Sequence, residues 1–129
     1  MKLLLDTHTF IWWDSQPDKL SQKALALCQE PTNTLLLSVA SIWEMQIKLQ
    51  LGKLKLNLPL AEVIESQRQT NNIEILPITL IHVLALESLP KHHKDPFDRL
   101  LIAQASVEDV FLVSCDRYLL SIQLSWLGS

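Results

Sequence analysis

The chain contains little glycine and no long hydrophobic run, and both shortages narrow the class of protein. With two glycines in its 129 residues, it has no glycine-rich linker, and residues 1–129 are expected to form a single domain. No apolar stretch reaches the roughly 18–20 residues needed to cross a bilayer. Asp6 ends the apolar run at residues 3–5, which is too short for the core of a secretory signal. We therefore expect a cytoplasmic protein without a membrane partner.

Cysteine and positive charge are also scarce. Cys28 and Cys115 fit no metal-binding spacing and are expected to be reduced core residues, so a zinc site is not predicted. With 11 Lys and Arg against 14 Asp and Glu, the net charge is −3, which argues against a protein held to nucleic acid by bulk charge alone. A local basic rim that contacts a nucleic-acid backbone is compatible with this net charge. Its candidates are Lys53, Lys55, Lys91 and Lys94.

Short apolar runs alternate with segments of helical periodicity. Buried strands are predicted at residues 2–6, 34–38, 73–78 and 110–114, with a further terminal strand at 122–127. Helices are predicted around 9–13 and at 19–30, 40–51, 60–70, 80–89 and 96–109. Strands that are apolar on both faces and alternate with helices indicate an α/β fold, with a mostly parallel sheet of four or five strands covered on both sides.

Four acidic residues lie at predicted strand ends and helix starts. Asp6 follows the first strand, Glu44 lies in the first turns of the helix after the second, Asp98 opens the helix before the fourth, and Asp116 follows that strand. Ligands of such sheets bind at the carboxyl ends of the strands. Converging carboxylates repel one another unless a cation is bound, and an all-oxygen set suits Mg²⁺ or Mn²⁺. Such a site can activate water for attack on a phosphate.

Each acid also has a purely structural interpretation. Asp6 could cap a helix, and Asp116 could start a turn. Ser41 and Glu44 match the S-x-x-E capping box. The functional interpretation therefore rests on all four acids together.

Asp95 and Asp98 are expected to have different roles. Asp95 precedes Pro96 and is suited to cap the helix, with proline at its first position. Asp98 would lie in the first turn, where the helix dipole favours negative charge, on the apolar stripe of Leu101 and Ile102.

Four stretches, in order along nearly the whole chain, carry a family resemblance. They are LLLDTHTFIWW (3–13), SVASIWEMQIKLQLGKL (38–54), HHKDPFDRLLIAQA (92–105) and LVSCDRYL (112–119), of which the third is the most specific. Together they resemble the PIN-domain ribonucleases, in particular the VapC-type toxins of bacterial toxin–antitoxin pairs. The resemblance implies a PIN-like three-layer α/β/α sandwich and a metal-dependent endoribonuclease. It also implies a homodimer and an antitoxin, encoded nearby, that inhibits the enzyme.

The resemblance assigns the catalytic, metal-binding site to Asp6, Glu44, Asp98 and Asp116. Thr7, Ser41 and Asp95 are candidates for supporting these ligands. Lys48, four residues after Glu44, is expected to form a pair with it on the helix surface. The four tryptophans are expected in the core or in a dimer interface rather than as stacking platforms for bases; they are Trp12, Trp13, Trp43 and Trp126.

Other functions remain open at this point. Phosphatases of the haloacid dehalogenase type need an acid two residues after the nucleophilic aspartate, where this chain has His8. A phosphate-accepting receiver domain would need paired acids near the N-terminus, and only Asp6 is there. A non-enzymatic PIN fold that binds RNA or a protein is the third alternative. Which RNA would be cleaved depends on loop shape and is not encoded in a motif.

Overall fold

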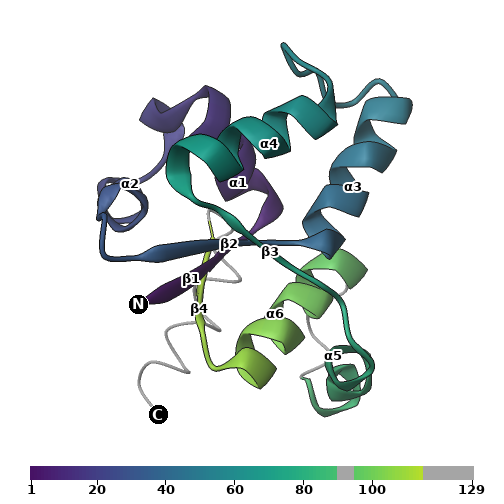
Figure 1. The fold of residues 1–129 in the computed structure, drawn as a ribbon. Helices are drawn as coiled ribbons and strands as arrows, with labels where there is room; N and C mark the ends of the chain where they lie inside the picture. Colours follow the sequence, from purple (N-terminus) through teal and green to yellow (C-terminus); the bar gives the residue numbers. More distant parts are fainter. Residues whose placement is uncertain (90–94, 115–129) are drawn as a thin grey trace.

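A parallel four-stranded sheet forms the centre of the molecule in a computed structural model, which describes residues 1–89 and 95–114 (Figure 1). The strands are β1 (Lys2–Leu5), β2 (Thr34–Ser38), β3 (Glu74–Leu76) and β4 (Phe111–Val113), in the spatial order β3-β2-β1-β4. β1 pairs with β2 and with β4, and β2 pairs with β3, all in parallel. The predicted α/β fold with a parallel sheet is confirmed.

Helices connect the strands and cover both faces of the sheet. They are α1 (Thr7–Ser15), η1 (Pro17–Lys19), α2 (Gln22–Gln29), α3 (Val39–Gln50), α4 (Leu60–Asn71), α5 (Leu80–Ala85), η2 (Leu86–Ser88) and α6 (Pro96–Glu108). In Figure 1, α1, α2 and α4 lie on one side of the sheet, and α5 and α6 lie on the other. The result is the expected three-layer sandwich.

The two central strands, β1 and β2, are mostly leucine because both of their faces are buried, whereas the edge strand β3 begins at the exposed Glu74. In β1, Leu3 and Leu5 belong to one hydrophobic cluster, together with Phe10 of α1. Leu4 points to the opposite face and packs with Leu101 of α6 in a second cluster. All three leucines of β1 are fully buried, as expected for a central strand of a parallel sheet.

Helix-capping residues define where the helices begin and end. Ser21 caps α2 by accepting a hydrogen bond from the amide of Ala24. After α3, Gly52 has φ +72°, the left-handed conformation expected of a residue that follows a helix end. The helix predicted at 40–51 is therefore confirmed together with its glycine stop.

Several predicted elements differ in extent from the structure. The strand expected at 73–78 is the three-residue β3, and the helix expected at 19–30 begins only at Gln22 as α2. The brief helix expected around 9–13 is the nine-residue α1, and the helix expected at 80–89 is divided into α5 and η2. The terminal strand predicted at 122–127 and Cys115 lie outside the described residues. Cys28 is a buried free cysteine, as predicted.

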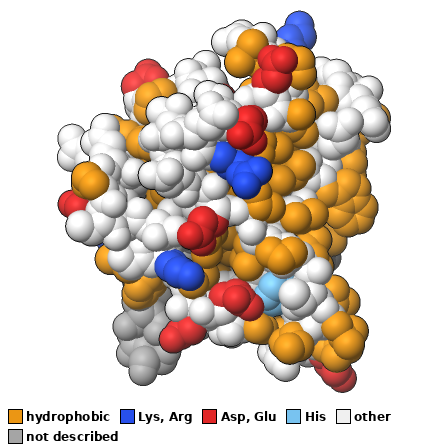
Figure 2. All heavy atoms as spheres, in the orientation of Figure 1, with side chains coloured by type: hydrophobic (Ala, Val, Ile, Leu, Met, Phe, Trp, Pro, Cys, Tyr) orange, Lys and Arg blue, Asp and Glu red, His pale blue; other side chains and the backbone are white. Residues whose placement is uncertain are grey.

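No helix within residues 1–89 and 95–114 has the length and hydrophobicity needed to cross a membrane. On the face shown in Figure 2, Lys and Arg side chains lie singly among acidic, apolar and uncharged polar ones, without a broad basic field.

Candidate functional site

The sheet has a topological switch point, where the strand order reverses, between β1 and β4. β1 is central, and the chain moves from it to β2 and β3 on one side before β4 is added on the other. In open α/β sheets, ligands bind in the crevice at this switch point. Asp6 lies there: it directly follows β1, and its amide donates to the carbonyl of Val113 at the end of β4, over 3.0 Å.

Asp6 is a buried carboxylate held by two hydrogen bonds. Only 3% of the surface of Asp6 is exposed to solvent. Oδ1 accepts from the amide of Thr9 over 2.8 Å and so caps α1, and Oδ2 accepts from Ser114 Oγ over 2.7 Å. No Lys, Arg or His within the described ranges forms a salt bridge with it. A buried anion without a cationic partner favours binding of a cation.

The carboxylate of Glu44 is hydrogen-bonded to Thr7, the residue that follows Asp6. Thr7 Oγ1 donates to Glu44 Oε1 over 2.7 Å and lies 3.1 Å from Ser41 Oγ, and all three residues are buried. The other oxygen, Glu44 Oε2, lies 3.0 Å from Lys48 Nζ, which confirms the pair predicted from their spacing. Thr7 thereby ties the beginning of α1 to α3, next to Asp6.

The alternative interpretation of Ser41 and Glu44 as a capping box is wrong. The N-cap of α3 is Ser38, whose Oγ accepts from the amide of Ala40 over 3.0 Å. Because β2 ends at Ser38 and α3 begins at Val39, no loop separates the two elements, and the helix starts three residues earlier than the motif suggests. Glu44 is therefore in the second turn of α3, free of a capping role.

The two acids at the start of α6 have the different environments that the sequence predicts. Asp95 is the N-cap: its Oδ1 accepts from the amides of Phe97 and Asp98 over 2.9 and 3.1 Å. Asp98 is half-buried in the first helical turn. This turn adjoins α3, because the rings of Phe97 and Trp43 meet edge to face with centroids 5.1 Å apart. The residues next to Asp98 and Glu44 in sequence are thus in contact.

The donor chemistry fits a divalent cation, although the described residues do not complete a site by themselves. Within them, no three Asp, Glu, His or Cys side chains form a metal-binding group. Asp116, His92, His93, Lys91 and Lys94 lie outside the described residues. What fits the ion is the buried carboxylate of Asp6, which has no ion-pair partner among residues 1–89 and 95–114, and the carboxylate oxygens of the other acids.

Comparison with known proteins gives the family. The model of the PIN domain family matches residues 3–123. The chain belongs to the PIN domain family. It is 28% identical over 120 residues to a protein named Ribonuclease VapC22 from Mycobacterium tuberculosis (strain ATCC 25618 / H37Rv), covering 92% of this chain and 90% of the relative.

Two solved structures share the fold of this PIN domain. One is VapBC2 from Rickettsia felis bound to a DNA fragment from their promoter, with a TM-score of 0.65 and 18% identity over 90% of this chain and 89% of that chain. The other is a toxin–antitoxin complex from Klebsiella pneumoniae, with a TM-score of 0.53 and 16% identity over 88% and 86%. At these identities the likeness establishes the PIN fold and nothing finer.

Sequence reasoning missed several polar residues of this PIN domain. Ser114, the residue after β4, holds Asp6, but a lone serine at a strand end carries no distinctive signal. Gln104 and His82 are both fully buried and hydrogen-bonded to each other's side chains. A glutamine inside the apolar run LLIAQA (100–105) was the available signal, because a buried amide needs partners.

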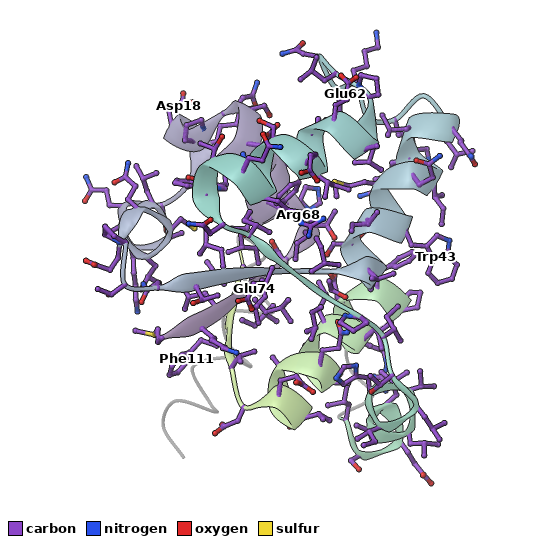
Figure 3. All side chains as sticks on the ribbon, viewed as in Figure 1. Asp18, Trp43, Glu62, Arg68, Glu74 and Phe111 are labelled. Carbon is purple, nitrogen blue, oxygen red and sulfur yellow. The ribbon has the colours of Figure 1, made fainter. Side chains whose placement is uncertain are left out.

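Trp43 is not in the core, so of the two places expected for the tryptophans only a dimer interface stays as a prediction for it. It is 57% exposed, and Figure 3 shows it pointing outward from α3.

Proposed function

We propose that this PIN domain is a metal-dependent endoribonuclease and the toxin of a toxin–antitoxin pair. The observation that carries the proposal is the buried carboxylate of Asp6 at the sheet's switch point, linked through Thr7 to Glu44. Membership of the PIN family and similarity to a protein named a ribonuclease support the choice of RNA as substrate. We also propose that residues 1–129 form one PIN domain.

The proposed ligands of the ion are Asp6, Glu44, Asp98 and Asp116, which also form the catalytic set. When bound, Mg²⁺ or Mn²⁺ would supply Lewis-acid activation of the attacking water and stabilise negative charge on the phosphate. Thr7 fixes one oxygen of Glu44, and Lys48 holds the other. Ser41 contacts Thr7 and supports it, while Asp95 contributes by capping the helix that bears Asp98.

The reaction proposed is hydrolysis without a covalent protein intermediate. An RNA phosphodiester would enter at the carboxyl edge of the sheet, with its phosphate directed to the acids. The carboxylates would hold the cation and orient the attacking water, and a bound divalent cation would offset part of their repulsion of the phosphate.

Two protein partners belong to the proposal. An antitoxin would block the site by presenting a cationic side chain to the carboxylates, because a basic group complements an acidic pocket. The fold shared with toxin–antitoxin complexes supports this partner. A homodimer and a cytoplasmic location remain predictions; light scattering during size exclusion tests the first, with a monomeric mass at all concentrations as the contrary result.

Cleavage of a pool of cellular RNAs tests the proposed function. The purified protein is incubated with the pool in Mg²⁺, in Mn²⁺ or in chelator, and the new ends are mapped. We expect discrete internal cuts that require the metal and disappear when the neighbouring gene product is added. Full cleavage after exhaustive chelation would contradict the mechanism. Binding of RNA without cleavage under any metal condition would instead favour the alternative, a catalytically silent PIN-fold binding module.

A further inference from the structure

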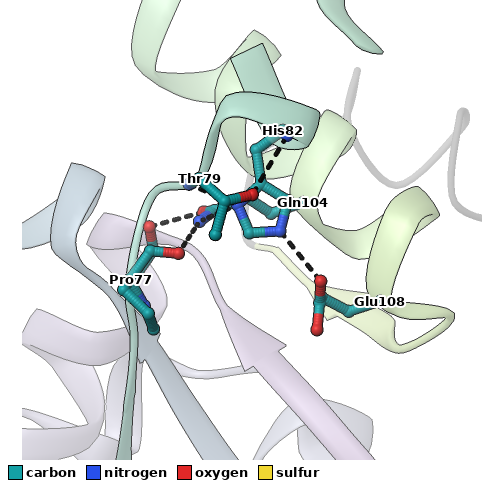
Figure 4. A network of polar contacts seen from close by, with 6 residues as sticks. Pro77, Thr79, His82, Gln104 and Glu108 are labelled. Carbon is teal, nitrogen blue, oxygen red and sulfur yellow. Dashed lines mark hydrogen bonds and ion pairs between the residues drawn. The ribbon is translucent and has the colours of Figure 1, made fainter. Parts of the chain in front are cut away.

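A buried polar network connects α5 and α6 to the start of α3 (Figure 4). Its centre is Gln104 of α6, which is 0% exposed. The amide nitrogen Nε2 donates to the carbonyl of Pro77 over 3.2 Å and lies 3.3 Å from His82 Nδ1. The amide oxygen Oε1 accepts from Ser38 Oγ over 2.5 Å. The side chain of Gln104 thus uses both donors and its acceptor.

The partners of the network determine where the protons are. The Pro77 carbonyl can only accept, so the Gln104 atom facing it is the NH₂ group. His82 Nδ1 therefore faces two donors, this NH₂ group and the amide of Thr79 at 3.1 Å, and must itself be unprotonated. The proton of the ring is on Nε2, which donates to Glu108 Oε2 over 2.9 Å. His82 is thereby a neutral imidazole in the Nε2–H tautomer.

The network reaches both helices that bear proposed ligands. Ser38 is the N-cap of α3, the helix of Glu44, and its hydroxyl donates to Gln104. Gln104 is in α6, the helix whose first turn contains Asp98. A single amide thus connects the beginning of one helix to the middle of the other.

The amide of Gln104 pairs with buried polar groups from distant parts of the chain. Its neighbours Ala103 and Ala105 are buried and apolar, so Gln104 places the only polar side chain of this short stretch in the interior. An apolar residue at position 104 would leave the Pro77 carbonyl and the Ser38 hydroxyl without the partner that the amide provides. Such fully satisfied networks fix one arrangement of the elements they join.

We propose that Gln104 is a positioning residue that sets the spacing between the Glu44-bearing helix α3 and the Asp98-bearing helix α6, and that His82 orients its amide. This inference rests on the proposed function, since it takes the two acids to be metal ligands. The side chain of Gln104 bonds Ser38, Pro77 and His82, so its proposed effect on Glu44 and Asp98 runs through Ser38 and through the axis of α6.

The first test compares two glutamines. Gln104→Met removes the network's centre at nearly constant volume, and Gln67→Met is the matched control. Gln67 is also a buried helical glutamine, but its side chain bonds Asp14 and Asn71, which belong to α1 and α4. We expect Gln104→Met to weaken Mn²⁺ binding by about tenfold, the low end of the cost of losing a residue that orients metal ligands. Gln67→Met should leave Mn²⁺ binding unchanged.

The same pair is measured without metal, so that the result does not depend on activity. Hydrogen exchange of the amides at residues 41–44 should be faster in Gln104→Met than in the wild type, and unchanged in Gln67→Met. Equal Mn²⁺ affinity and equal exchange in Gln104→Met and the wild type would overturn the inference.

A second pair separates the two nitrogens of His82. His82→Asn keeps an acceptor near the Nδ1 position for Gln104 and Thr79, while His82→Gln keeps a donor near the Nε2 position for Glu108. We expect His82→Asn to weaken Mn²⁺ binding less than His82→Gln. The opposite order would show that the contact with Glu108, and not the orientation of Gln104, matters.

Nitrogen-15 NMR of the unmodified protein keeps the inference testable even if the variants fold poorly. At neutral pH, His82 should show the neutral Nε2–H tautomer; an Nδ1–H tautomer or an imidazolium would overturn the assigned network. The wild type also separates this inference from the proposed function. If the wild type neither binds Mn²⁺ nor cleaves RNA, the function fails; if it does both and Gln104→Met matches it, only the positioning role fails.

Discussion

At the scale of a single residue, Asp6 combines a structural role as a helix cap with a proposed role as a metal ligand. The carboxylate caps α1 through the amide of Thr9 and, in our proposal, also binds the metal. Asparagine caps a helix about as well as aspartate but carries no charge. The two tasks can therefore be separated by substitution at this one position.

We predict that Asp6→Asn retains the stability of the wild type and loses metal-dependent cleavage. The Ser114 hydroxyl can rotate to suit the new amide. Asp6→Ala should lose cleavage and, in addition, about 0.5–2 kcal/mol of unfolding free energy with the cap. Urea unfolding in chelator and single-turnover cleavage would measure both effects. Wild-type cleavage by Asp6→Asn would show that Asp6 is only a cap.

The start of α6 offers the complementary comparison between two residues. Asp98→Asn should abolish cleavage and leave the protein folded, because the shape is kept and the N-terminal turn loses only about 0.3–1 kcal/mol of favourable interaction with the helix dipole. Asp95→Ala should lower the unfolding free energy by about 0.5–2 kcal/mol, since two amides lose their acceptor, and still cleave RNA.

Thermal melts in chelator and single-turnover assays on both variants decide between the roles. Normal cleavage by Asp98→Asn, or a fully stable but inactive Asp95→Ala, would show that the two roles are assigned wrongly.

At the scale of elements, local signals in the sequence gave the strands and most helices correctly. Unbroken leucine runs predicted β1 and β2, and Asp95 followed by Pro96 located the start of α6. The capping box at Ser41 failed because the passage from strand to helix at Ser38 has no loop, and a motif alone does not show which serine the backbone uses. The apolar run at 80–89 likewise gave no sign that α5 ends at Ala85 and continues as η2.

The central strand should be highly sensitive to loss of volume. Leu4 is 0% exposed and is paired in register with Leu36 and Leu112 of the flanking strands. We predict that Leu4→Ala lowers the unfolding free energy by about 2–5 kcal/mol, as do other large-to-small changes in cores. Lys2→Ala, at the exposed end of the same strand, should change it by less than about 0.5 kcal/mol. A similar loss in both variants, measured by urea unfolding, would contradict the described packing.

At the scale of the whole molecule, the layers follow from periodicity but the candidate site does not. Alternation of apolar strands and helices predicts the sandwich, and the order of strands places Asp6 at the switch point. The bonds that shape the site join distant residues: Ser38 to Gln104 across 66 positions, and Ser114 to Asp6 across 108. Such hydrogen bonds depend on how the layers pack together, so no local sequence pattern predicts them. For the same reason, convergence of Asp6, Glu44 and Asp98 on one ion stays a prediction.

That convergence is tested most directly by anomalous scattering from crystals of the protein soaked with Mn²⁺. We predict one manganese peak at the carboxyl edge of the sheet, coordinated by oxygens of Asp6 and Asp98 and close to Glu44. The peak should be absent from crystals of Asp98→Asn grown under the same conditions. A manganese ion bound away from these acids, or none at a concentration of Mn²⁺ that supports cleavage, would contradict the account.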